Sequence, residues 1–470
     1  MRRSILLYLL LVGTPVLGVL ATTKLGERLT APVAVENAVR IGGSSQAITV
    51  HLPTLLLQIG VILIVARVVG WLFRKIHQPQ VVGEMAAGIM LGPSLLGWLA
   101  PGVSRALFPP ESLGFLNSLS QIGLVLFMFL VGLELDPRIL RGRTHAAVVI
   151  SHTSILVPFL LGALLALFLY PRLSDEGVMF SHFALFLGTA MSITAFPVLA
   201  RILTEQNLLR TRVGALTIAC AAVDDVTAWC ILAGVVLLVR AGSVTIPFWL
   251  TLFGTAAYAG LLFFGVRRAL RRIEARYRSR NKITQHMLAI ILLLVLASAW
   301  VTEWLGIHAL FGAFLMGAIM PKDHGFVRAL TEKMEHLIVV LLLPLFFAFT
   351  GLRTSVGLVS GAQMWLFCGL IIAVAIAGKF GGSTISARLT GMPWREAGVV
   401  GILMNTRGLV ELVVLNIGLD IGVISPALFT MMVFMALATT FMTSPLLEWI
   451  YPARLRQEEP RSSKTIAETI

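Results

Sequence analysis

Two adjacent aspartates, Asp224 and Asp225, stand inside a stretch of the sequence that is otherwise apolar. If this stretch crosses a membrane, each carboxylate costs about 2.5–3.5 kcal/mol on insertion scales, so such residues are usually functional and paired. Neighbouring residues on a helix point about 100° apart, so the two acids need not share a partner. A cation paired with one acid would leave the other free to bind and exchange ions.

Lys379, in the segment AIAGKFGGSTIS, is the one lysine that falls inside a predicted membrane span. The protonation of a buried amine depends on any carboxylate beside it, so this lysine would respond to what a neighbouring aspartate binds. Glycines flank the lysine and allow adjacent helices to approach closely. The structural alternative is a static pair of aspartate and lysine that only fixes the packing of two helices.

The composition predicts that these residues are positioned by membrane-spanning helices. Hydrophobic residues make up 57% of the 470 and charged residues only 13%, whereas an ordinary soluble domain carries about 25% charged residues. Apolar stretches of about twenty residues, long enough to cross a bilayer, recur along the chain. We therefore predict an all-α polytopic membrane protein with about thirteen transmembrane helices, at 52–72, 80–100, 114–135, 144–170, 180–202, 211–239, 246–266, 285–304, 306–321, 337–353, 361–388, 395–418 and 424–450.

The basic residues predict the orientation of these spans. Of the 37 lysines and arginines, 25 fall in alternate loops and in the C-terminal tail, which makes that side cytoplasmic. The charges form no basic stripe with interleaved aromatic residues, so the net charge of +14 does not indicate a nucleic-acid partner. The resulting predicted domains are a signal peptide or extra N-terminal helix, an extracytoplasmic segment, the transmembrane domain and a short cytoplasmic tail, at 1–21, 22–51, 52–450 and 451–470.

An internal repeat relates the two halves of the chain. The matching segments are GEMAAGIM with GAFLMGAIM, LFMFLVGLEL with LFFAFTGLRT and, more weakly, GTAMSIT with GILMNTR, at 83–90 with 312–320, 126–135 with 345–354 and 188–194 with 401–407. Matched spans are seven apart, and an odd separation places the two copies in opposite orientations. This predicts a six-plus-six inverted repeat with the seventh span as linker, which is typical of secondary transporters. Chance similarity among short apolar strings is the alternative.

Two matched spans carry residues that interrupt a membrane helix. In SITAFPVLARIL, Pro197 removes a backbone donor and blocks the helix around 193–196. Its counterpart, GILMNTRGLVEL, places polar residues amid apolar ones. We predict two broken helices, interrupted near Ser192 and Pro197 and near Asn405 and Thr406, whose freed carbonyls and half-helix ends coordinate a cation. A proline kink in one span and a polar packing cluster in the other is the alternative.

Three further charged residues lie within predicted spans. Arg407 and Glu411 fall one turn apart on the same span, and Glu84 opens the second span. Intramembrane charges usually pair with one another. We expect these three to form secondary, structural ion pairs.

Six ordered motifs resemble the monovalent cation:proton antiporter superfamily, most closely its branch of plant cation/proton exchangers and fungal potassium/proton antiporters. The motifs are VVGEMAAGIMLGPSLLG, FMFLVGLELD, SITAFPVLARIL, AAVDDVTAWCILA, LLPLFFAFTGLRT and MNTRGLVELVVLNIG. The resemblance covers about residues 50 to 450 and implies a homodimer with a dimerisation domain and a mobile core domain. It also implies that Asp225 carries the transported ion or proton and that Asp224 pairs with Lys379. The two broken spans would cross beside these acids, with Ser192, Pro197, Asn405 and Thr406 at the crossing. The short tail predicts that the large cytosolic regulatory domain of many relatives is missing.

These observations lead to one functional hypothesis, a secondary active antiporter that exchanges K⁺ or Na⁺ for H⁺ by elevator-type alternating access. The proton and the cation compete for Asp225, with Thr194 and local carbonyls as further oxygen ligands. No enzyme activity, cofactor, ATP or structural metal is expected, and the expected location is a bacterial inner membrane. The alternatives are a gated potassium efflux channel on the same scaffold and a membrane sensor that transports nothing.

Overall fold

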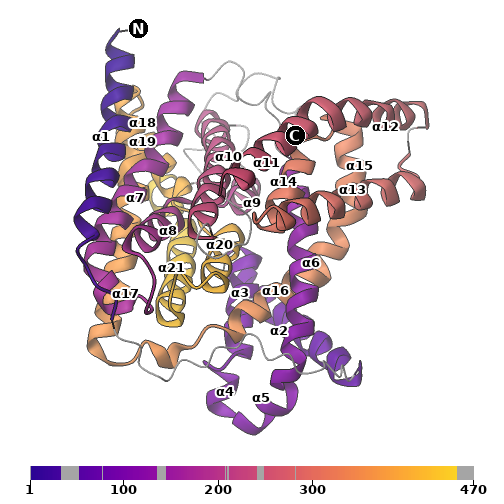
Figure 1. Ribbon diagram of the computed structural model, residues 1–470, viewed down its shortest axis with the longest axis horizontal. Helices are drawn as coiled ribbons and strands as arrows, with labels where there is room; N and C mark the ends of the chain where they lie inside the picture. Colours follow the sequence, from indigo (N-terminus) through magenta and orange to yellow (C-terminus); the bar gives the residue numbers. More distant parts are fainter. Residues whose placement is uncertain are drawn as a thin grey trace.

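The computed structural model describes residues 2–32, 52–76, 78–134, 144–206, 208, 211–240, 248–280 and 282–452. Within these residues every regular element is a helix, and the helices pack together as a bundle (Figure 1). Ten are long and apolar enough to cross a membrane, or eleven if the bent pair Trp394–Met404 and Leu409–Asp420 is one span. The protein is therefore an all-helical membrane protein, which confirms the class that its composition predicts.

The first half of the chain contains the helices α1 (Arg2–Gly26), α2 (Leu52–Lys75), α3 (Gln80–Leu91), α4 (Leu96–Leu99), α5 (Pro101–Leu107), α6 (Pro110–Glu134), α7 (Thr144–Leu173), α8 (Phe180–Ser192), α9 (Phe196–Glu205) and α10 (Arg212–Arg240). The middle contains α11 (Phe248–Gly260), the π-helical η2 (Leu261–Val266), α12 (Arg267–Arg280), α13 (Gln285–Trp304) and α14 (Ala309–Ile319).

The last third contains α15 (His324–Leu337), the π-helical η3 (Ile338–Leu342), α16 (Leu343–Leu352), the 3₁₀ turn η4 (Val356–Leu358), α17 (Gly361–Ile376), the π-helical η5 (Ala377–Gly381), α18 (Gly382–Leu389), α19 (Trp394–Met404), α20 (Leu409–Asp420) and α21 (Pro426–Ile450).

Two of the thirteen predicted spans are not among the long apolar helices of the described residues. The span predicted at 306–321 is α14, whose eleven residues are too short to cross a bilayer unaided. The span predicted at 246–266 begins outside the described residues and continues as α11 and the π-helical η2. The other eleven correspond to the ten long helices and the bent pair.

Helix breaks occur in both spans for which the sequence predicts an interruption. Helix α8 ends at Ser192 and α9 begins at Phe196, with Pro197 in the first turn, where a missing amide hydrogen has no cost. Helices α19 and α20 are bent by 45° at their break. The two breaks meet, because the Ala195 amide donates a hydrogen bond of 3.1 Å to the carbonyl oxygen of Thr406.

Gly408 allows this close meeting of the breaks. Its φ of +155° disfavours other residues, and a Cβ there would lie 2.8 Å from Cγ2 of Val198. A side chain at this position would therefore push α20 away from α9.

Two glycine contacts hold the repeat-related helices together. A Cβ on Gly88 of α3 would lie 2.1 Å from the Phe347 carbonyl oxygen of α16, and Gly351 meets Gly88 equally closely. A Cβ on Gly317 of α14 would lie 2.2 Å from the Phe129 carbonyl oxygen of α6, beside Gly132. The repeat matches Gly88 with Gly317 and Gly351 with Gly132. The Gly88–Gly351 contact of one half is therefore the counterpart of the Gly317–Gly132 contact of the other.

The N-terminal helix α1 packs along α7, where both run side by side at one flank of the bundle (Figure 1). A Cβ on Gly18 would lie 2.7 Å from a Leu160 methyl carbon, and the Tyr8 and His152 rings meet at 5.8 Å. The helix reaches Gly26, so the predicted outward segment 22–51 begins helical; residues 33–51 and 453–470 of the predicted segment and tail lie outside the described residues.

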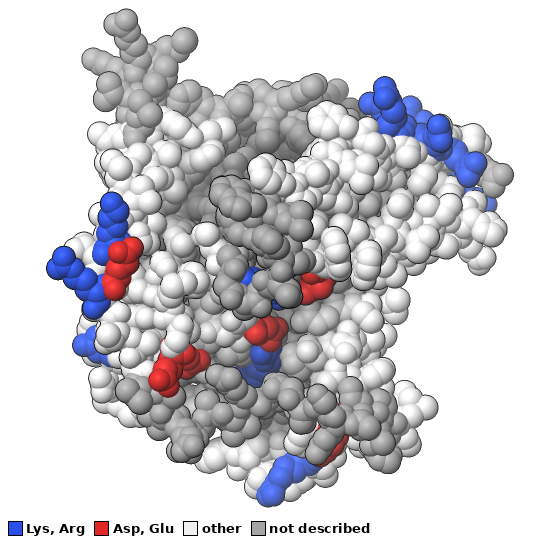
Figure 2. Space-filling view, in the orientation of Figure 1, with Lys and Arg blue, Asp and Glu red and all other residues white. Residues whose placement is uncertain are grey.

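Exposed basic side chains gather over α12, which extends from one side of the bundle (Figure 2). The helix reads RRALRRIEARYRSR, and its apolar Leu270 and Tyr277 are buried. This amphipathic pattern places the arginines on the surface that the positive-inside rule predicts to be cytoplasmic.

Candidate functional site

Asp224 lies at the centre of a hydrogen-bond network in the middle of α10. Its Oδ1 accepts a hydrogen bond of 2.5 Å from the Ser151 hydroxyl, and its Oδ2 accepts one of 2.6 Å from Ser154. The Thr194 hydroxyl and the Lys379 ammonium each lie 3.0 Å from Oδ2. All of these side chains are buried, so the carboxylate is fully coordinated by protein groups.

Lys379 satisfies all three donors of its ammonium group without solvent. Besides Asp224, it donates to the Ser154 carbonyl oxygen at 2.9 Å and to the Ser192 carbonyl oxygen at 2.5 Å. The lysine stands on the π-helical turn η5, where Gly378 packs against Pro158 of α7. This close approach of η5 to α7 brings the ammonium between α7, α8 and α10.

Arg407 lies at the break between α19 and α20 and binds the C-terminal end of α8. One guanidinium nitrogen donates to the Ala190 carbonyl at 2.8 Å and to Glu411 at 3.0 Å, and the other donates to the Met191 carbonyl at 2.5 Å. Carbonyls at a helix C-terminus have no intrahelical partner and carry the negative end of the dipole. Arg407 and Lys379 together therefore cap three successive carbonyls of the broken helix.

Asp225 is as buried as Asp224 but has no hydrogen-bond partner among the residues that the structure describes. Its side chain is 0% exposed, and within the described part of the chain neither Oδ1 nor Oδ2 accepts a hydrogen bond. An ionised carboxylate cannot stay buried without a counter-charge. Asp225 is therefore chemically suited to hold either a proton or a bound cation.

The remaining predicted site residues fall into two groups. Thr194, Ser192, Asn405 and Thr406 all lie at the crossing, and the amide oxygen of Asn405 is buried without a partner among the described residues. Glu84 does not join this network. Its Oε1 accepts a hydrogen bond of 2.8 Å from Gln80 within α3, and no ion pair within 4.0 Å joins it to another described residue, unlike the Arg407–Glu411 pair.

The sequence interpretation missed three residues of this site, Ser151 and Ser154 on α7 and Trp229 on α10. The polar run SHTS at 151–154, inside a long apolar span, is the signal that points to the serines. A spacing of three places them on one helix face. Trp229 follows Asp225 by four residues and therefore lies one turn away on the same face.

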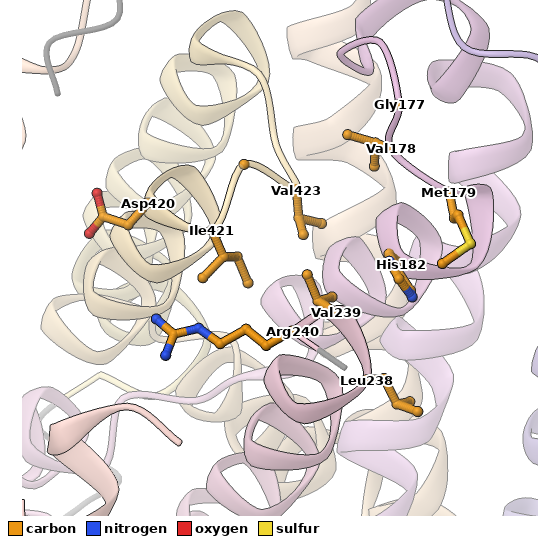
Figure 3. A pocket seen from close by; sticks show the side chains of 11 residues that line it. Gly177, Val178, Met179, His182, Leu238, Val239, Arg240, Asp420, Ile421 and Val423 are labelled. Atoms are coloured by element: carbon orange, nitrogen blue, oxygen red, sulfur yellow. The ribbon is translucent and has the colours of Figure 1, made fainter. Parts of the chain in front are cut away.

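A cavity of about 730 Å³ lies at the C-terminal end of α10 and is separate from Asp224 and Asp225. Its lining comes from the start of α8 and from the ends of α10 and α20 (Figure 3). Arg240 in this lining is fifteen residues from Asp225, or about 22 Å along the helix. Ion pairs join Arg240 to Glu303 at 3.7 Å and Asp420 to Arg353 at 2.6 Å beside the cavity.

Comparison with known proteins identifies the family. Residues 61–449 match the model of the sodium/hydrogen exchanger transmembrane domain. The chain belongs to the sodium/hydrogen exchanger family. This result confirms the resemblance that the six motifs carry, and the match includes both acids, Lys379 and both helix breaks.

Among members of the sodium/hydrogen exchanger family, the Na(+)/H(+) antiporter NhaS4 of Synechocystis sp. is 46% identical over 400 residues, which cover 85% of this chain and 97% of that protein. Cation/H(+) antiporter 17 of Arabidopsis thaliana is 41% identical over 89% of this chain and 51% of its own length. K(+)/H(+) antiporter 1 of Saccharomyces cerevisiae is 36% identical over 88% of this chain and 48% of its own length. The chain thus spans about half the length of these plant and yeast relatives.

The fold is also similar to that of a solved exchanger. The sodium proton antiporter MjNhaP1 from Methanocaldococcus jannaschii superimposes with a TM-score of 0.60, covering 86% of this chain and 99% of the other. At 15% sequence identity, this similarity concerns the fold alone.

Proposed function

We propose that this monovalent cation/proton antiporter, which exchanges Na⁺ or K⁺ for H⁺, binds its two substrates in turn at Asp225. One observation carries the proposal: of two adjacent buried acids, Asp224 is fully coordinated, whereas both oxygens of Asp225 have no partner among the described residues. A protonated acid cannot bind an alkali cation, and a cation-bound carboxylate cannot hold the proton. Exchange follows from this competition.

Asp224 serves as a fixed partner of Lys379 in this proposal rather than as a second exchange site. Its oxygens already accept bonds from three hydroxyls and one ammonium, so a cation would have to displace those donors. The ammonium and carboxylate neutralise each other, which leaves Asp225 as the charge that the substrates must balance.

The crossing of the broken helices supplies the other cation ligands. Alkali cations are hard and prefer oxygen donors. The Thr194 hydroxyl and the amide oxygen of Asn405, which has no partner among the described residues, both stand at the crossing. The geometry of these oxygens sets the preference between Na⁺ and K⁺.

The proposed architecture has thirteen transmembrane helices in a six-plus-six inverted repeat. The matched glycine contacts support it, since a two-fold operation that exchanges the halves turns the Gly88–Gly351 contact into the Gly317–Gly132 contact. The meeting of the two breaks, seven predicted spans apart, supports it as well. Elevator-type movement of the core helices against the remaining helices then presents the site to each side in turn.

We further propose a homodimer in a bacterial inner membrane, with the C-terminus in the cytoplasm. The distribution of lysine and arginine among the loops supports this orientation. The similarity to the Synechocystis antiporter over nearly its whole length supports a bacterial membrane.

The test is a proteoliposome assay with an acidic lumen and a lumenal pH indicator. Adding Na⁺ or K⁺ outside should raise the lumenal pH with the wild-type protein and leave it unchanged with Asp225→Asn. The matched control is Glu111→Gln, an exposed acid at the start of α6, which should exchange like the wild type. Full activity of Asp225→Asn would refute the proposal, and a cation current independent of the proton gradient would indicate a channel.

A further inference from the structure

Trp229 lies one turn beyond Asp225 on α10 and is 2% exposed. The spacing of four residues places its indole N–H on the same helix face as the Asp225 carboxylate, and no hydrogen bond joins the two groups. Within the described residues the indole N–H has no other acceptor. One turn of α10 thus contains a buried donor and a buried acceptor, and neither has a partner in the described part of the chain.

The indole ring also makes the aromatic contact between α10 and α14. It meets Phe311 edge-on with ring centroids 5.5 Å apart, and it stacks on Phe314 at 5.8 Å. Aromatic pairs prefer defined geometries, so the indole ring has one favoured packing position, called here its seat, between the two phenylalanine rings. A displacement of α10 along α14 would require the ring to leave this seat.

Helix α14 is itself held tightly by neighbours other than α10. A Cβ on Gly312 would lie 2.1 Å from the Ser298 carbonyl oxygen of α13, and one on Gly317 would lie 2.2 Å from the Phe129 carbonyl oxygen of α6. Backbone contacts this close leave α14 little freedom to follow α10. The seat of the indole ring is therefore a fixed surface against which α10 moves.

We infer that Trp229 is a positioning residue that makes the contact between α10 and α14 depend on whether Asp225 is occupied. The inference rests on the proposed function. When Asp225 is ionised and empty, the carboxylate attracts the indole N–H and holds the ring between Phe311 and Phe314, because hydrogen bonds to charged acceptors are the stronger ones. A bound proton or cation satisfies the carboxylate, releases the N–H and lets α10 slide.

This coupling would prevent the empty, charged site from crossing the membrane. An antiporter that returned empty would carry cation or proton without exchange, so exchange requires that the unoccupied state stays in place. Trp229 is the residue that links the chemistry of the site to the surface along which the core helices move.

Among the described residues, few other charged groups lie near this part of α10, whose thiols Cys220 and Cys230 are uncharged in their protonated form. Asp224 is the neighbour of Asp225 on the same helix, and Lys379 approaches from η5. The Arg407–Glu411 pair lies at the break between α19 and α20. The α7 side contributes the uncharged hydroxyls of Ser151 and Ser154. Helix α14, with the sequence ALFGAFLMGAI, carries no titratable side chain.

Trp229→Phe tests the inference, since it keeps an aromatic ring and removes the N–H. We expect it to retain exchange, with a pH–activity curve moved toward alkaline pH by about one unit, the equivalent of a tenfold change in an equilibrium constant. Without the indole N–H, the ionised carboxylate of Asp225 loses a hydrogen-bond donor, so a higher pH is needed to remove its proton. Uncoupled cation efflux, measured as cation loss that no proton uptake accompanies, should rise several-fold. Trp300→Phe, exposed on α13, should match the wild type in both assays.

Phe314→Leu tests the seat independently of the donor. It should raise the uncoupled efflux and leave the pH–activity curve in place. The inference is overturned if Trp229→Phe matches the wild type in both assays, or if Phe314→Leu shows wild-type efflux. Failure of the proposed function is a distinct result, because wild-type protein would then show no exchange or Asp225→Asn would be active.

Discussion

Lys379 donates a hydrogen bond of 2.5 Å to the carbonyl oxygen of Ser192, the last residue of α8. The same ammonium lies 3.0 Å from Asp224. One side chain thus joins the acid pair to a helix break, so the charge of the site and the shape of the backbone depend on each other.

Lys379→Met should destabilise the protein by about 3–5 kcal/mol, because it leaves Asp224 ionised, buried and unpaired. The double variant Lys379→Met with Asp224→Asn removes both charges and should recover most of that stability. Thermal unfolding in detergent measures the difference. A single variant as stable as the wild type would contradict the assignment of Asp224 and Lys379 as a buried ion pair.

Ser151→Ala and Ser154→Ala should each destabilise the protein by about 1.5–3 kcal/mol, the usual contribution of a hydrogen bond to a charged group. Each removes a short hydrogen bond to Asp224, of 2.5 and 2.6 Å. The matched control is Ser118→Ala, an exposed serine of α6 whose hydroxyl bonds only within its own helix. Equal unfolding temperatures for all three variants would show that the serines do not hold the carboxylate.

Arg407→Lys should abolish exchange even though it keeps the charge. The planar guanidinium reaches the carbonyls of Ala190 and Met191 and Glu411 at once, whereas an ammonium cannot match this geometry. The matched control is Arg388→Lys, an exposed arginine of α18. Wild-type exchange rates for Arg407→Lys in proteoliposomes would mean that its charge alone is needed.

Gly88→Ala and Gly317→Ala should each destabilise the protein by about 1–3 kcal/mol, as overpacking does, because the new methyl group meets a backbone carbonyl that cannot turn aside. Gly369→Ala on α17 adds the same methyl group where nothing lies within 4 Å and should be tolerated. Size-exclusion chromatography and thermal unfolding in detergent compare the three variants. Unchanged behaviour of the first two would disprove the close packing of α3 on α16 and of α14 on α6.

Sequence patterns were sufficient for the features that depend on local chemistry. A long apolar stretch must be helical in a membrane, since each backbone group needs a partner there. Pro197 favours a break in its helix because it removes a backbone donor, and an ionised buried acid needs a counter-charge, for which Lys379 was the candidate partner. The helix in span 306–321 is shorter than its apolar pattern predicts. Its apolar residues resemble a full span, yet only Ala309–Ile319 forms the helix, which begins after Gly306 at a φ of +84° and ends before Pro321.

The sequence by itself determined the class of the protein, the pair of acids and the two interrupted helices, because charge, hydrophobicity and proline act on the nearest residues of the chain. The family resemblance implied that Asp224 pairs with Lys379, but only the tertiary structure showed which hydroxyls coordinate Asp224 and that Asp225 lacks a partner among the described residues. Ser151, Ser154 and Thr194 lie 73, 70 and 30 residues from Asp224, and chain order does not reveal which face of a helix such distant hydroxyls meet. The difference between Asp224 and Asp225 arises from that packing.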